Sequence, residues 1–215
     1  MAKSDDLRDN LESLRLKNGK QYTLRDNKDR FFFPHEYMKF EDALKPKQKH
    51  SVIVLINTGA RIMEVQNVKV EDCDLQNHRI ILRVTKTKAK KGEKKGKVRI
   101  ISVSSQFAKY LRKYIRDNNL KDNDYIGVIS NPALNIAYKK AGQKAGIKDY
   151  WNIASHTFRK THGNWLKALG IDGGEICTRL GHDYNTFLSA YASPDIFTWE
   201  DKNKMRDVLG DLYRK

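Results

Sequence analysis

Apolar residues are sparse in the first 30 positions and dense from Phe31 onward. In the polar N-terminal stretch, Leu7, Leu11 and Leu14 have the spacing of one face of a short helix, and residues 19–30 are typical of a linker. We therefore divide the chain into an N-terminal extension, a folded domain and a C-terminal helical segment: residues 1–30, 31–195 and 196–215.

A helical period of apolar residues runs through most of the folded domain. Pro34 suits the first turn of a helix toward Leu44, and the apolar run within residues 49–56 predicts a second helix that ends near Gly59. The same reasoning predicts further helices over residues 61–67, from Ser104 onward, from Asn131 as N-cap to Ala145, and over residues 156–169, 174–180, 187–191 and 199–213.

Three short stretches instead favour strands: residues 68–70, 78–85 and 97–103. The last two flank a turn rich in Gly and Lys at residues 86–96, which predicts an antiparallel pair. The fold class expected from these patterns is α+β, mainly α-helical with one small three-stranded antiparallel sheet.

Charge adds a partner to this picture. The chain has 42 Lys and Arg against 26 Asp and Glu, a formal net charge of +16. Such an excess favours a polyanion, nucleic acid before an anionic membrane surface, although a merely soluble basic protein would share it. There is no apolar run of the roughly 18 residues that span a bilayer and no secretory signal, so a cytoplasmic protein is expected.

The two cysteines do not change this view. Cys73 and Cys177 have neither the spacing of a disulfide framework nor that of metal ligands, so we expect two buried free thiols.

Four sites carry candidate chemistry. In Thr-Gly-Ala-Arg-Ile-Met-Glu at residues 58–64, Arg61 follows the Gly that ends an apolar helix. His156 and Arg159 lie three residues apart, on one face of a predicted helix. A Leu-Gly-His triplet ends at His182, and Tyr191 follows nine residues later.

The order Arg, Lys, His-x-x-Arg, Leu-Gly-His, Tyr resembles that of the tyrosine recombinases, the family of phage integrases and Xer- and Cre-like enzymes. The resemblance runs from about Phe31 to Ala192, and the 23-residue interval from Arg159 to His182 and the interval to Tyr191 both match. A lone His-x-x-Arg would be weak, whereas four boxes in order with matched spacing are specific.

The resemblance implies the fold of a tyrosine recombinase catalytic domain and a reaction. Tyr191 would attack a DNA phosphodiester and form a 3′-phosphotyrosine with a free 5′-hydroxyl, and a partner strand would then reverse the step without metal, ATP or other cofactor. Arg61 and Arg159 would clamp the non-bridging oxygens, with Glu64 supporting the first arginine. His156 and His182 would donate hydrogen bonds and help handle the tyrosine proton.

A lysine of the predicted turn would protonate the leaving 5′-oxygen. Lys86 is the first choice by position, and Lys88 is the runner-up. The remaining lysines of the turn, and the lysine that follows Arg159 where many members have His, are expected to hold phosphates, which makes binding salt-sensitive. The predicted DNA-binding residues are Lys88, Lys90, Lys91, Lys94, Lys95 and Lys160.

Other residues receive less specific predictions. His162 lies off the face of His156 and is expected to be structural, and Tyr213 is a spare nucleophile without matched spacing. A basic stripe on the helix after Ser104 fits a solvated face as well as a DNA contact.

Typical members carry an additional N-terminal helical domain that completes a clamp around DNA, so a truncated or minimal enzyme is expected here. The expected partner is double-stranded DNA, bound by a tetramer on paired sites and by a protein that is a monomer alone. Association with the nucleoid and a viral or mobile-element origin would fit. Two other functions stay open, relaxation of DNA like a type IB topoisomerase and non-catalytic DNA binding.

Overall fold

The computed structural model describes residues 13–15, 21–23, 30–83, 98–185 and 196–213. Their elements are strands β1 (Ser13–Arg15), β2 (Gln21–Thr23), β3 (Cys73–Asp74), β4 (Arg79–Arg83) and β5 (Val98–Ser102); α-helices α1 (Pro34–Asp42), α2 (Pro46–Thr58), α3 (Ile62–Gln66), α4 (Ser105–Asp117), α5 (Asn131–Lys144), α6 (Ser155–Ala168), α7 (Gly173–Leu180) and α9 (Trp199–Leu209); and short 3-10 helices η1 (Val70–Asp72) and η2 (Tyr150–Asn152).

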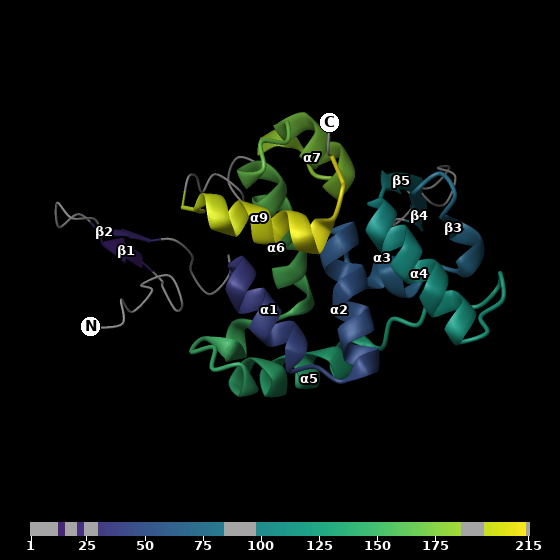
Figure 1. The fold of residues 1–215 in the computed structure, drawn as a ribbon, viewed down its shortest axis with the longest axis horizontal. Helices are drawn as coiled ribbons and strands as arrows, with labels where there is room; N and C mark the ends of the chain where they lie inside the picture. Colours follow the sequence, from purple (N-terminus) through teal and green to yellow (C-terminus); the bar gives the residue numbers. More distant parts are fainter. Residues whose placement is uncertain (1–12, 16–20, 24–29, 84–97, 186–195, 214–215) are drawn as a thin grey trace, which may run out of the picture.

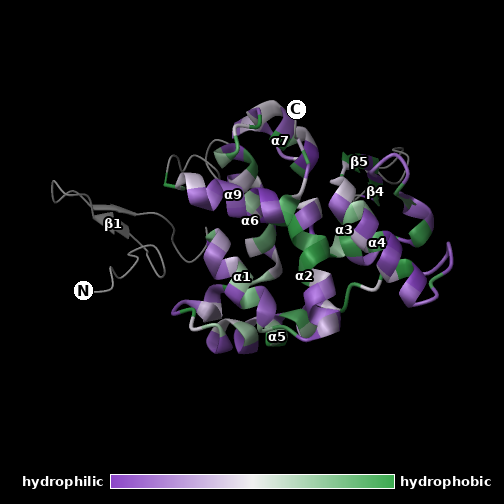
Figure 2. Ribbon diagram, viewed as in Figure 1, coloured by the Kyte–Doolittle hydropathy of each residue, from purple (hydrophilic) through white to green (hydrophobic). Residues whose placement is uncertain are grey.

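Helices α2 and α6 pack against each other in the middle of the molecule, with α1, α5 and α9 around them (Figure 1). The apolar residues of α2 face this interior (Figure 2), and Leu55 and Ile56 are fully buried there. Phe158 and Trp165 of α6 are equally buried. Burial of these large side chains supplies the main driving force for the helical body.

Local signals explain where the first helices begin and end. Pro34 and Pro46 occupy the first turns of α1 and α2, where a missing N–H costs nothing. Helix α2 ends at Gly59, whose φ of +62° is the left-handed conformation that glycine adopts without strain. Arg61 therefore follows an abrupt turn.

Arg30, just before the predicted boundary, is anchored to the helical body. Arg30 is 2 % exposed and pairs with Glu36 at 2.6 Å and with Asp149 at 2.8 Å. Phe32 is held on α6 through its backbone. Its N–H donates to Thr161 Oγ1 at 2.9 Å, and its carbonyl accepts from Trp165 Nε1 at 3.0 Å.

The sheet lies beside α3 and α4, in the order β3-β4-β5 (Figure 1). Both pairings are antiparallel, and Ile81 stands opposite Ile100. The fold class is confirmed as mostly helical with one small three-stranded antiparallel sheet.

The first strand was nevertheless misplaced by the apolar pattern. Residues 68–70 form no strand of this sheet, and β3 begins at Cys73. The cause is a distant partner: Val70 N donates to Asp124 O at 2.9 Å, and Ile126 N donates to Val68 O at 3.1 Å. These backbone groups are satisfied by the loop after α4, which leaves the sheet to start later.

Three predictions in other segments were also wrong. Leu14 lies in β1, where it pairs with Tyr22 of β2, so the chain there is extended rather than helical and the predicted linker contains a strand. The N-cap of α5 is Ser130, and Asn131 is the first helical residue. Leu7, Leu11 and the helix predicted over 187–191 lie outside the described residues.

Helix α9 packs on α1, α2 and α6 of the same chain. Met205 and Leu209 are its buried contacts, at 0 % and 1 % exposure. Among the described residues, no helix is both long and apolar enough to cross a membrane. Cys177 is buried and Cys73 partly buried, both as free thiols.

Candidate active site

Arg159 joins two of the sequence boxes at one point. Its Nη1 donates to Gly59 O at 2.8 Å, and its Nη2 donates to Leu180 O and, at 3.0 Å, to His182 Nε2. The side chain is 1 % exposed. A guanidinium so deeply buried is stabilised by these carbonyl acceptors, which also hold the ends of α2 and α7 around it.

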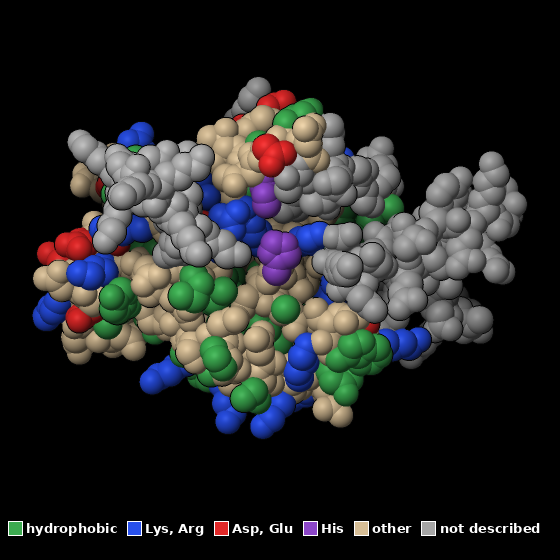
Figure 3. Space-filling view, turned by 180° about the vertical axis from the view of Figure 1, so that it is seen from behind, with side chains coloured by type: hydrophobic (Ala, Val, Ile, Leu, Met, Phe, Trp, Pro, Cys, Tyr) green, Lys and Arg blue, Asp and Glu red, His purple; other side chains and the backbone are tan. Residues whose placement is uncertain are grey.

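His182 is a neutral base beside cationic groups. Burial, and then the charges of Arg159, Arg61 and His156, together lower its pKa to about 4. Because Nε2 accepts a hydrogen bond from Arg159, the proton of the neutral ring is on Nδ1. Figure 3 shows histidine side chains gathered with Lys and Arg side chains near the centre of one face.

Arg61 is held by Glu64 through both backbone and side chain. The Arg61 N–H donates to Glu64 Oε2 at 2.9 Å, and Arg61 Nη1 donates to Oε1 at 3.0 Å. Arg61 is 30 % exposed, so its guanidinium is accessible, whereas Glu64 is 1 % exposed. Glu64 caps α3 from the third helical position, which is why a Glu three residues after the Arg suits this turn.

The Glu64 carboxylate is ionised despite its burial. Burial acts to raise its pKa, but the Arg61 N–H and the guanidiniums of Arg99 and Arg61 lower it below the usual value. Arg99 comes from β5, and its Nη2 donates to Glu64 Oε2 at 2.7 Å. The sequence did not single out Arg99, because nothing in its local pattern separates it from other basic residues near the turn.

A second buried pair stands behind the site. His162 Nδ1 donates to Ile56 O at 2.6 Å, and Arg179 Nε donates to His162 Nε2 at 2.7 Å. Burial, then the charge of Arg179, holds the pKa of His162 well below its ordinary value. These contacts agree with the structural role expected of His162. Arg179 carried no motif and was missed.

Tyr213 is placed as a partner of this scaffold. Its ring lies 5.9 Å from the Arg179 guanidinium carbon. Burial raises the pKa of its phenol above 10 even though the nearby Arg179 charge opposes the rise. A raised pKa disfavours the phenolate, so the geometry gives no support to Tyr213 as a nucleophile.

The remaining predicted residues divide into described and undescribed positions. His156 is exposed on α6. Lys160 is 7 % exposed, less than expected for a lysine that contacts DNA on an open surface, and its DNA contact stays a prediction. The predicted nucleophile and the lysines of the predicted turn lie outside the described residues: Tyr191, Lys86, Lys88, Lys90, Lys91, Lys94 and Lys95.

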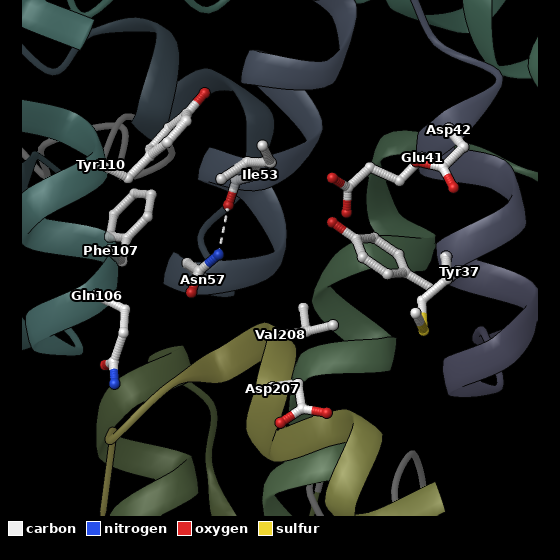
Figure 4. Close-up of a pocket in the computed structure, with 11 residues that line it drawn as sticks. Tyr37, Glu41, Asp42, Ile53, Asn57, Gln106, Phe107, Tyr110, Asp207 and Val208 are labelled. Atoms are coloured by element: carbon white, nitrogen blue, oxygen red, sulfur yellow. Dashed lines mark hydrogen bonds between the residues drawn. The ribbon is translucent and has the colours of Figure 1, made fainter. Parts of the chain in front are cut away.

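A cavity of about 380 Å³ lies elsewhere, between α1, α2, α4 and α9 (Figure 4). Glu41, Asp42 and Asp207 give its wall negative charge. The candidate site residues Arg61, Arg159 and His182 do not line it. An acidic wall repels phosphate, so this cavity is not a candidate for DNA cleavage.

Basic side chains of α4 have partners on the protein. Lys113 and Arg116 both pair with Asp117 at the surface, and Arg112 donates to Leu75 O at 3.1 Å.

Across the part of the chain that the structure describes, there is no group of three or more His, Cys, Asp or Glu side chains arranged to hold a metal ion.

The fold and the site define a catalytic domain of the tyrosine recombinase class, and the chain belongs to the phage integrase family, whose model matches residues 32–196. The tyrosine recombinase XerA of Saccharolobus solfataricus is 32 % identical over 138 residues, which cover 64 % of this chain and 43 % of that protein. A probable integrase/recombinase of Acholeplasma phage L2 is 26 % identical over 139 residues, which cover 62 % and 44 %.

Solved structures agree in fold. A XerA recombinase superposes with a TM-score of 0.61 at 23 % identity and covers 82 % of this chain and 64 % of its own. The catalytic domain of bacteriophage HP1 integrase has a TM-score of 0.57 at 15 % identity, with coverage of 85 % and 96 %. The chain spans about half the length of the curated relatives that it matches.

Proposed function

We propose that the protein is a site-specific DNA recombinase that cuts and rejoins strands through a 3′-phosphotyrosine at Tyr191. The observation that carries the proposal is the convergence of Arg61, Arg159 and His182, from three separate boxes, around the ends of α2 and α7. Two guanidiniums at one site can clamp the non-bridging oxygens of a phosphodiester, where charge builds up during in-line displacement.

The cleavage step follows from this chemistry. The Tyr191 oxygen forms a bond to phosphorus while the bond from phosphorus to the 5′-oxygen breaks, and Arg61 and Arg159 stabilise the charge on the other two oxygens. His182, neutral at physiological pH with its proton on Nδ1, would donate a hydrogen bond, and His156 would help handle the tyrosine proton. Lys86, with Lys88 as the runner-up, donates a proton to the leaving 5′-oxygen.

Rejoining is the same step in reverse. A 5′-hydroxyl of the partner strand attacks the phosphotyrosine and releases the Tyr191 phenol. One phosphoester bond is exchanged for another in each step, so the bond energy is conserved and the sum of the two steps consumes no nucleotide cofactor.

Double-stranded DNA is the substrate and partner that we propose. The net charge of +16 supports it, as do two related structures, XerH recombinase bound to a difH substrate and Tn1549 integrase in complex with transposon end DNA. We further propose a monomer in the absence of DNA, a tetramer on paired sites and action on cytoplasmic DNA, with phosphates held by the turn lysines and Lys160.

The test is a nicked suicide substrate, from which the cleaved fragment diffuses away and traps the covalent adduct. Tyr191→Phe removes the attacking oxygen, so the adduct should vanish while DNA affinity stays within about fivefold, because the hydroxyl contributes about 1 kcal/mol or less to binding. Peptide mapping of the wild-type adduct should identify Tyr191.

Tyr184→Phe is the matched control, since Tyr184 is 55 % exposed and seven residues before Tyr191. It should form the adduct at the wild-type level. Persistence of the adduct in Tyr191→Phe would disprove the assignment of the nucleophile, and a wild-type protein that binds DNA without any adduct would disprove the enzymatic function.

A further inference from the structure

Arg99 of β5 is the least expected contact of the active site. Its side chain is 11 % exposed, and its Nη2 donates at 2.7 Å to the same Oε2 atom of Glu64 that accepts the backbone N–H of Arg61. Glu64 Oε1 accepts from the Arg61 guanidinium. One buried carboxylate therefore stands between two guanidiniums, of which only Arg61 is substantially exposed.

The same side chain lies close to the Leu-Gly-His turn. Gly181 ends α7 with φ +63°, and a Cβ built there would overlap Arg99 Nη1 and lie 3.3 Å from its guanidinium carbon. The backbone conformation favours glycine at this position, and a larger residue would also have to displace the end of the Arg99 side chain. The His182 that follows hydrogen-bonds to Arg159.

Arg99 also links the site to the sheet. It stands opposite Leu82 in the β4–β5 pair, and in the sequence these two strands flank the turn that carries Lys86. A single side chain therefore joins the strand pair next to the proposed general acid, the carboxylate behind Arg61 and the turn before His182.

We propose that Arg99 is a positioning residue for cleavage, which holds Glu64 and thereby Arg61 in register with the Leu-Gly-His turn and the lysine-bearing strand pair. The inference rests on the proposed recombinase function. In the proposed role, Arg99 does not touch the phosphate. It acts through Glu64, in the way that buried partners of an active-site group set the orientation of that group.

Adduct formation under single-turnover conditions tests the proposal. Arg99→Ala should lower the rate about 10- to 100-fold, the range typical for loss of a supporting partner, while DNA affinity changes by less than about threefold because Arg61 keeps its charge. Arg99→Lys keeps the charge but cannot reach both Glu64 and Gly181. Its rate should therefore lie between that of the wild type and that of Arg99→Ala.

Arg83→Ala is the matched control. Arg83 also lies in the sheet and pairs with a buried carboxylate, Asp72, which is 3 % exposed. If Arg99 were only a structural ion pair, the two variants would lose stability and activity alike. The proposal predicts that Arg83→Ala cuts within about threefold of the wild-type rate once both are compared per folded molecule, a difference of about 0.7 kcal/mol or less.

The pH profile separates positioning from loss of folding. The charged groups that face Glu64 among the described residues are Arg61 at the start of α3 and Arg99 from β5. Without Arg99, burial raises the pKa of Glu64, so protonation at falling pH releases Arg61. The rate of Arg99→Ala relative to wild type should therefore decline further as pH falls from about 7.5 to 5.5.

A stability measurement covers the case in which Arg99→Ala is poorly folded. Gly181→Ala should lower the melting temperature more in the wild type than in the Arg99→Lys background, because the shorter lysine side chain relieves the overlap.

The proposal is overturned if Arg99→Ala cuts at the wild-type rate, if Arg83→Ala is equally impaired, or if the effects of Gly181→Ala and Arg99→Lys on the melting temperature are additive. Absence of an adduct in the wild type itself would instead overturn the proposed function.

Discussion

At the scale of single residues, Arg159 holds two helix ends together and is one of the two arginines proposed to clamp the phosphate. The carbonyls of Gly59 and Leu180 accept from its two terminal nitrogens, and these carbonyls belong to the ends of α2 and α7. Lysine offers one charged nitrogen in place of this planar fork. The exposure of 1 % means that any donor left without an acceptor would carry the full cost of desolvation.

Arg159→Lys leaves the net charge unchanged but removes the planar pair of donors, so it should still lower the rate of cleavage. We expect the rate of adduct formation to fall by about 10²- to 10³-fold, as for loss of one preorganised donor to a developing oxyanion, with DNA affinity within about fivefold. The measurement is the suicide-substrate assay beside a binding titration. A rate within about threefold of wild type would show that the bidentate geometry is not used in the reaction.

At the scale of elements, the question for α9 is whether it packs on its own chain or on a neighbouring subunit. Its apolar side packs on α1, α2 and α6, and Met205 and Leu209 are buried there. The same amphipathic pattern would suit a neighbouring subunit in a tetramer. The two arrangements bury the same side chains and differ in whether stability depends on protein concentration.

Met205→Ala removes the central contact of α9. We expect a loss of about 2 to 5 kcal/mol in the free energy of unfolding, the usual range for a buried Met or Leu replaced by Ala. Chemical denaturation at two protein concentrations that differ 20-fold is the measurement. With α9 packed on its own chain the midpoints should agree, and a midpoint that rises with concentration would indicate exchange between subunits.

At the scale of the whole molecule, buried histidines make stability depend on pH. His50 Nε2 donates to Ile126 O at 2.7 Å, and burial lowers the pKa of His50 to about 4. The pKa of His162 also lies well below 6.5 because of burial and Arg179. Both rings are thus neutral in the folded chain at pH values where the unfolded chain binds protons.

The sign of the effect follows from these depressed pKa values. As pH falls from about 6.5 to 5, the unfolded state gains protons that the folded state does not, so the free energy of unfolding should decrease by up to about 1.4 kcal/mol per pH unit for each histidine. Urea denaturation at several pH values measures the slope. His50→Gln should reduce the slope by one proton, whereas an unchanged stability between pH 6.5 and 5 would contradict the neutral, buried assignment.

Much of the fold, and the set of candidate site residues, could be predicted from the sequence alone. Helical periods, prolines at first turns and Gly59 at a helix end are local signals, so α1, α2, α6 and α7 were predicted close to their true bounds. The order and spacing of Arg61, His156, Arg159 and His182 likewise depend only on positions along the chain.

Only the tertiary structure decided which distant residues support these groups. Glu64 meets Arg99, and His162 meets Arg179, across elements whose approach depends on the path of the whole chain. The segment at residues 68–70 has an apolar pattern that fits a strand, yet its backbone bonds to residues 124 and 126 instead of to the sheet. Hydrogen-bond partners far apart in the sequence are set by packing between remote segments, and the local pattern does not identify them.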